Sequence, residues 1–162
     1  MALIALHPIV RGPKYHFEHL IVNVSQSPKS YGENPLIELA ILLAGASLGI
    51  IVFQSAVLAP LVFTQLKDGS SGPFLRALFP RFFVILGLLG LVSAISSSLG
   101  DFDRGTLLGA IGLVLAVIAY ILIPGTNLAR DQGRKKAFKR LHLASVLLTL
   151  GIGVSNLLVI FR

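Results

Sequence analysis

Four long stretches without a charged residue dominate this sequence. No Asp, Glu, Lys or Arg occurs in residues 39–66, 82–100, 105–129 or 141–161. A helix needs about 20 largely apolar residues to cross the hydrocarbon core of a bilayer. In a soluble protein, four such helices would be apolar on every face and would leave little polar surface for water. The sequence therefore predicts an all-α membrane protein, built as a four-transmembrane-helix antiparallel bundle.

The ends of these stretches divide the chain into two parts. We expect an N-terminal extramembrane or interfacial arm at residues 1–35 and a transmembrane domain at residues 36–162. The arm contains only short apolar runs broken by prolines, so none of it is long enough to span. Asn34 and Pro35 match a helix cap followed by proline in the first turn. The spans are expected near residues 36–66, 81–99, 105–123 and 139–161.

Three prolines mark places where the spans are expected to be irregular. As a helix, residues 36–66 would measure roughly 45 Å against a hydrocarbon core of about 30 Å, so this span must tilt, kink or protrude. We expect Pro60 to supply a kink. Pro80 is expected to start the second span after a short interfacial segment at residues 74–79. Pro124 is expected to break or bend the third span.

The net charge of +7 is distributed unevenly along the chain. The arm with Glu38 just after it, the loop at residues 101–104 and the C-terminal residue together carry five cations and five acids. The two other connections and their flanks carry nine cations and two acids. Because cationic loops stay on the cytoplasmic side, we expect loops 67–80 and 130–138 in the cytoplasm or its organellar equivalent, with both termini opposite. Membrane topology accounts for the positive charge, and we expect no nucleic-acid partner.

The same uneven charge predicts contacts with lipid headgroups. Cationic residues beside transmembrane helices attract anionic lipids. We therefore expect bound lipids. The expected lipid-phosphate contacts are Arg76, Arg130, Arg134, Lys135, Lys136, Lys139 and Arg140.

Small residues recur inside the spans at helix-packing spacing. Small side chains let transmembrane helices approach closely, either within the bundle or between proteins, and the pattern does not choose between the two. We expect a protein partner to bind the arm at residues 1–35 and these Gly-rich helix faces. The pairs are Gly45 with Gly49, Gly87 with Gly90 and Ala94, Gly105 with Gly109, Ala116 with Ala119, and Gly151 near Ser155.

Polar residues are few within the expected spans, and those of interest as intramembrane polar residues are Gln54, Ser155 and Asn156. In dry surroundings each needs a hydrogen-bond partner. For Gln54 and Asn156, an interhelical hydrogen bond that fixes packing and a contact with a substrate or ion are both open.

Several kinds of chemistry are excluded or unsupported. The chain has no cysteine, which excludes disulfides, thiol nucleophiles and cysteine-ligated metal clusters. His142 is chemically capable, but the three other histidines precede the first span on the opposite side, so a buried bis-histidine haem site is not expected. No HExxH motif, nucleotide-binding Gly-rich loop or paired intramembrane carboxylates occur. We expect no enzyme, no metal site and no cofactor, and a haem protein is the weakest alternative.

Three segments resemble a known family. They are FQSAVLAPLVFTQL at residues 53–66, FLRALFPRFF at residues 74–83, and FKRLHLASVLLTLGIGVSN at residues 138–156. Together they are similar to an uncharacterised family of small membrane proteins typified by the eukaryotic transmembrane protein 205, also described as domain of unknown function 4149. The resemblance covers about residues 40–160, implies four spans and brings no established activity.

The resemblance also singles out residues at the ends of the helices. It directs attention to Phe79, Pro80, Phe82, Phe138, His142, Ser155 and Asn156. Our topology places Pro80 and His142 on the same side of the membrane. Together with nearby polar residues they form a candidate cluster: Phe79, Pro80, Arg81, Asn127, Asp131 and His142. The function we expect is an accessory or assembly subunit of a membrane complex, and the alternative is a small-molecule or metal-ion carrier that uses this cluster.

Overall fold

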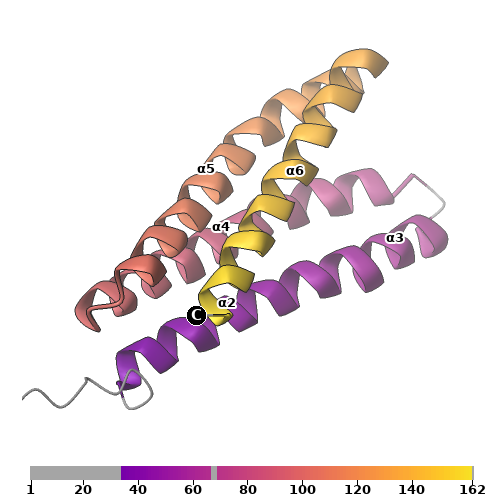
Figure 1. Cartoon of the computed structure of the whole chain (residues 1–162). Helices are drawn as coiled ribbons and strands as arrows, with labels where there is room; N and C mark the ends of the chain where they lie inside the picture. Colours follow the sequence, from indigo (N-terminus) through magenta and orange to yellow (C-terminus); the bar gives the residue numbers. More distant parts are fainter. Residues whose placement is uncertain (1–33, 67–68, 162) are drawn as a thin grey trace, which may run out of the picture. The chain divides into compact units, whose positions relative to one another are not determined.

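The computed structural model describes residues 34–66 and 69–161, which form four long helices (Figure 1). The first consists of α2 (Pro35–Phe53), a π-helical turn η1 (Gln54–Leu58) and α3 (Ala59–Gln65). The others are α4 (Ser71–Leu99), α5 (Asp103–Asp131) and α6 (Lys135–Ile160). All four are long and apolar enough to cross a membrane, and they pack as the predicted antiparallel bundle. The predictions for the arm at residues 1–33 lie outside the described residues.

Asn34 caps the first helix, as the sequence predicted. Its side-chain oxygen accepts a hydrogen bond from the Leu36 amide at 3.0 Å, which satisfies a backbone donor that has no partner within the helix. Its side-chain nitrogen donates to the carbonyl of Gly100, at the end of α4, at 3.3 Å. The cap therefore also ties the start of α2 to the end of α4.

The helices α4 and α5 approach so closely that their backbones touch. A Cβ atom added to Gly109 would lie 2.8 Å from the backbone nitrogen of Ala94. A Cβ atom added to Gly90 would lie 3.0 Å from the backbone nitrogen of Leu113. Only glycine fits at such distances, so the small residues predicted to pack do so here.

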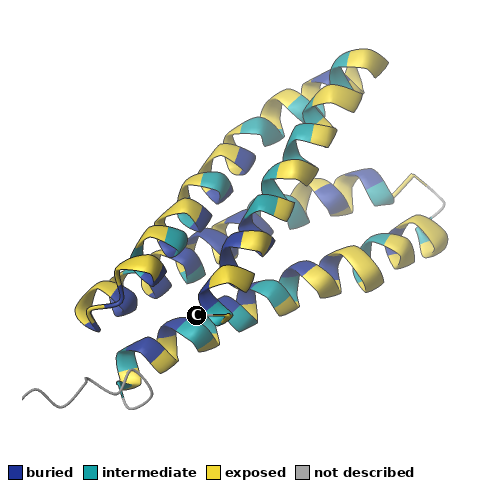
Figure 2. Cartoon of the chain, in the orientation of Figure 1, coloured by how far each residue is buried: buried dark blue, intermediate teal, exposed yellow. Residues whose placement is uncertain are grey.

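Two apolar clusters hold the bundle together. One is centred on Phe82, Phe83 and Leu86 of α4 and includes Ile51 and Ile152. The other lies near the 101–102 turn and consists of Ile37, Ala44, Phe102 and Val159. Buried residues follow the sides of the helices that face one another, and exposed apolar side chains cover the outer faces (Figure 2). Outer faces of this composition fit contact with lipid.

Pro80 does not start a helix, contrary to the prediction. The helix α4 begins at Ser71 and passes through residues 74–79 and Pro80 without interruption. A proline removes one backbone donor, and nearby side chains can supply another in a transmembrane helix. In the same turn, Nη1 of Arg81 donates to the carbonyl of Ala77. The carbonyl that Pro80 leaves without its backbone donor is that of Arg76, four residues earlier, so this bond lies beside the gap and does not fill it.

Pro124 likewise lies inside a continuous helix. The helix α5 runs on to Asp131, and the Thr126 hydroxyl donates to the Leu122 carbonyl at 2.9 Å. The next helix, α6, already begins at Lys135, so the predicted loop at residues 130–138 is confined to a short turn. Polar residues at both ends extend these helices beyond the uncharged stretches from which the spans were predicted.

Pro60 is accommodated by a wider turn directly before it. In a straight α-helix its ring would clash with the carbonyl of Ala56. Residues Gln54–Leu58 instead form η1, in which the Ala59 amide donates to the Gln54 carbonyl, five residues back. The helix then continues as α3, so α2, η1 and α3 form one continuous rod (Figure 1).

Candidate functional site

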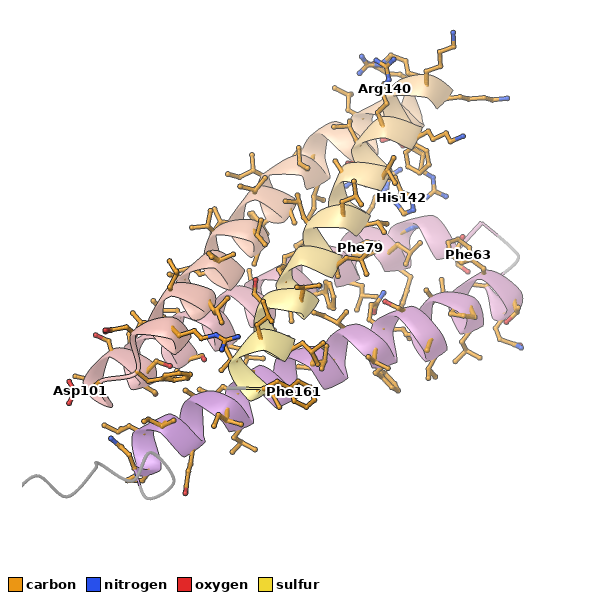
Figure 3. All side chains as sticks on the ribbon, in the orientation of Figure 1. Phe63, Phe79, Asp101, Arg140, His142 and Phe161 are labelled. Carbon is orange, nitrogen blue, oxygen red and sulfur yellow. The ribbon has the colours of Figure 1, made fainter. Side chains whose placement is uncertain are left out.

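The predicted cluster lies where α3 and α5 end and where α4 and α6 begin. We call this end of the bundle the basic end. Figure 3 shows His142 and Arg140 there on α6, whereas Asp101 and Phe161 lie at the opposite end. The structure therefore places the basic residues of α4, α5 and α6 at one end, except Arg104 in the first turn of α5.

An ion pair joins α4 to α5 at the basic end. Nη1 of Arg76 donates to Oδ2 of Asp131 at 3.1 Å, and its Nη2 contacts Oδ1 of the same carboxylate. Both side chains are nearly half exposed, at 43% and 47%. Asp131 was predicted to serve the candidate cluster and Arg76 to bind lipid phosphate, whereas the structure pairs them with each other. The sequence feature that could have predicted this pair is the presence of opposite charges on two neighbouring antiparallel helices.

The other polar members of the cluster do not converge. Arg81 is exposed and bonds to the backbone of its own helix. His142 is also exposed, and its ring stacks on Phe138 of the same helix at 5.9 Å between centroids. Within residues 34–66 and 69–161, no hydrogen bond or ion pair links Arg81, Asn127 and His142. The same residues contain no group of three His, Cys, Asp or Glu side chains placed to hold a metal ion.

Phe79 of the candidate cluster packs inside the bundle with the neighbouring Phe82 and Phe83. The ring of Phe79 lies 6.3 Å from that of Phe83 and 6.5 Å from that of Phe82. Phe82 and Phe83 are buried, and their rings are 5.1 Å apart. Pro80, in the same stretch, is partly buried. Aromatic rings at these distances stabilise a core, so the LFPRFF segment has a structural role.

The remaining cations line the same end. The guanidinium of Arg130 lies over Gly72 of α4, 3.7 Å from where a Cβ atom would be. The others are exposed in or next to the first turns of α6, and their contact with lipid phosphate stays a prediction. They are Arg134, Lys135, Lys136, Lys139 and Arg140.

Gln54 is a buried polar residue at the start of the π-helical turn. Its exposed fraction is 7%, and its amide forms no hydrogen bond with any described residue. The expected interhelical hydrogen bond is therefore not present in the described part of the chain. Among the described residues, the enclosed side-chain polar atom without a hydrogen bond is Oγ of Ser97, so the Gln54 amide keeps slight access to the surface. π-helical turns often accompany functional sites.

Two other buried polar residues form side-chain hydrogen bonds within their own helix. The Ser155 hydroxyl donates to the Gly151 carbonyl, and Nδ2 of Asn156 donates to the Ile152 carbonyl. The Ser93 hydroxyl, in contrast, donates across to the Ala40 carbonyl of α2 at 3.2 Å. This interhelical bond was not predicted, because any serine in a helix has a carbonyl of its own turn within reach.

Four apolar helices that bury their small residues against one another define a multi-pass integral membrane protein with four spans. Residues 42–161 match the family model described as domain of unknown function (DUF4149), and the chain belongs to this family. The resemblance noted from the sequence is thereby confirmed. No curated protein and no solved structure matches the chain.

Proposed function

We propose that this protein is a non-enzymatic accessory or assembly subunit that binds another transmembrane helix along α2. The observation that carries the proposal is an open face on α2. A Cβ atom added to Gly45 or Gly49 would meet no other atom within 4 Å. In the α4–α5 pair, by contrast, the space beside Gly90 and Gly109 is occupied by the backbone of the neighbouring helix.

The residues around these glycines favour a helix as the partner. Leu42 and Val52 lie on the same side of α2 as Gly45 and Gly49, by helical spacing, and are 68% and 57% exposed. A small-xxx-small pair flanked by larger apolar side chains is the surface that transmembrane helices pack against. A second protein would place its helix in the shallow depression that the glycines leave.

A photocrosslinking residue at Leu42 tests this proposal in native membranes. We expect a discrete crosslinked species from position 42, and none from a matched probe at Leu147, which is 58% exposed on α6. Adding Gly49→Ile should abolish that species, because the larger side chain fills the depression. Ala110→Ile, at an exposed small residue of α5, should leave it intact.

Two results would contradict the proposal. One is a chain that migrates alone from native membranes and gives no adduct at position 42. The other is an adduct that persists unchanged in Gly49→Ile while circular dichroism shows that the helices are intact.

Gln54 supports a second candidate, the carrier of a small molecule. Its unpaired amide could donate and accept hydrogen bonds to a substrate passing through the bundle. Under this alternative, Gln54→Leu abolishes transport without loss of folded protein, and His142→Ala does so if the basic end takes part. Unchanged transport in both variants would remove this alternative.

The charge distribution supports a proposal for orientation, with the basic end in the cytoplasm or its organellar equivalent. Because the chain has no native cysteine, single cysteines report accessibility without interference. A membrane-impermeant thiol reagent added outside should label Asp103→Cys and spare Gln132→Cys. The reverse pattern would invert the orientation.

A further inference from the structure

A shallow apolar groove of about 220 Å³ runs along the outer surface between α4 and α5. Val84, Leu88 and Leu91 line it from α4, and Val117 and Tyr120 line it from α5. Gly87 lies at the same contact, where a Cβ atom would be 3.6 Å from Leu113. Because glycine has no side chain to fill the space, a groove remains between the exposed walls.

The groove is directed along the helices toward the basic end. On α5, Tyr120, Asn127 and Asp131 are seven and then four residues apart, so they share one face of the helix. On α4, Arg81 precedes Leu88 by seven residues and shares its face in the same way. Both walls therefore lead from apolar side chains to polar ones.

Beyond the residues that line the groove, α4 and α5 carry net positive charge at the basic end. Arg76, Arg81 and Arg130 stand against a single acid, Asp131. Asp131 is engaged by Arg76, and Arg130 lies over Gly72. Arg81 uses one donor on the Ala77 carbonyl, and its guanidinium has five donors in all. Among the described residues, Arg81 and Arg130 have no acid bound to them, and of these two Arg81 shares its helix face with Leu88, which lines the groove.

We propose that this groove binds one acyl chain of an anionic phospholipid whose phosphate is held by Arg81. The two halves of the site match the two halves of that ligand, since an apolar channel along the helices takes the chain and a guanidinium takes the phosphate. At 1.5 Å per residue, Tyr120 lies about 16 Å below Asp131. That depth corresponds to the acyl region beneath a headgroup.

A single tryptophan reports which lipid occupies the groove, because the native chain has none. The variant Tyr120→Trp is reconstituted as the full chain in phosphatidylcholine vesicles that contain increasing fractions of phosphatidylglycerol with brominated acyl chains. Bromine quenches tryptophan only on contact, so the curve yields a relative binding constant at this position. We expect the anionic lipid to be preferred about fivefold, the contribution of one cation near a membrane surface.

Matched variants separate the proposed site from ordinary lipid contact. Leu147→Trp is similarly exposed on α6 and should show no preference between the two lipids. In the Tyr120→Trp background, Arg81→Gln should abolish the preference and Arg81→Lys should retain most of it. Arg140→Gln removes an equal charge from α6 and should leave the preference unchanged.

Equal preference at positions 120 and 147 would overturn the proposal and indicate general lipid contact. A preference that survives Arg81→Gln would overturn the role of Arg81, and hence the site. Inorganic phosphate added in excess should not displace the brominated lipid, and displacement would indicate a free-anion site instead. Circular dichroism of each variant confirms that the quenching is measured on folded protein.

Discussion

The α4–α5 pair and the first helix use the same small residues to opposite effect. In the pair, Gly90 and Gly109 let two backbones touch, and nothing larger than glycine fits. On α2, Gly45 and Gly49 are four residues apart, as Gly105 and Gly109 are on α5, but a Cβ atom at either would meet no atom within 4 Å. A small-residue motif therefore identifies a face that permits close packing, and the neighbouring helix decides whether that face is filled.

The two regions also differ in how they are anchored along their length. The α4–α5 pair is clasped at the basic end by Arg76 and Asp131 and in the middle by backbone contact. The first helix is held along α2, where Ser93 bonds to Ala40 and Asn34 bonds to Gly100. Beyond η1, α3 has no extensive packing contact with another helix. The first helix is thus fixed over one part and loosely held over the other.

The largest expected effect comes from filling the α4–α5 contact. Gly109→Val places atoms inside the contact distance of the Ala94 backbone, which cannot move without separating the helices. We expect a loss of about 3 kcal/mol in unfolding free energy, at the upper end for overpacking. Thermal unfolding in detergent, followed by circular dichroism, measures the loss. Stability equal to the wild type would show that the helices do not touch here.

Gln54→Leu should raise stability by no more than about 1 kcal/mol, since it replaces a largely buried amide that forms no hydrogen bond with a described residue but keeps slight access to the surface. The same unfolding experiment measures this change. A loss of similar size would mean that the amide has a partner and that the first helix is anchored at η1 after all.

Gly49→Ala should stabilise the isolated protein by roughly 0.5–1 kcal/mol, because a methyl group meets nothing there and alanine favours a helix. Gly109→Ala serves as the matched variant and should have the opposite sign. If both substitutions destabilise, α2 is packed as tightly as the α4–α5 pair, and the contrast between the two regions is lost.

The smallest expected effect concerns the clasp at the basic end. A double-mutant cycle with Arg76→Gln and Asp131→Asn should give a coupling of about 0.5 kcal/mol, since both side chains are nearly half exposed. Raising the salt concentration should reduce the coupling. A value that does not depend on salt would indicate a more enclosed pair than the exposed fractions suggest.

The fold was largely predictable because its causes are local in the sequence. Uncharged length sets the number of spans, and Asn34 followed by Pro35 specifies a helix start that the structure confirms. The prolines were less predictable. The helix α4 continues through Pro80, and whether a proline starts, kinks or merely interrupts one bond of a helix depends on packing that the local sequence does not show.

The candidate site was less predictable than the fold. Residues were assigned to the same end of the bundle correctly, but a shared end does not imply contact. Arg76 forms an ion pair with Asp131, and the His142 ring stacks on Phe138 of the same helix. Which cation meets an acid depends on the rotation of each helix about its axis, and helices that are apolar on nearly every face carry little information about that rotation.

The π-helical turn makes chain length, as well as composition, a condition of this fold. A π-helical turn contains one residue more than the α-helical turn it replaces. Each residue of an α-helix advances the chain by about 100° of rotation. Deleting one residue from Gln54–Leu58 would therefore leave an ordinary α-helical turn and keep α2 and α3 in register, but the Pro60 ring would then meet the carbonyl four residues before it. A deletion within α2, which has no extra residue to give up, would instead rotate its two parts by about 100° against each other. The first helix is thus more sensitive to a one-residue deletion in α2 than to one in the π-helical turn.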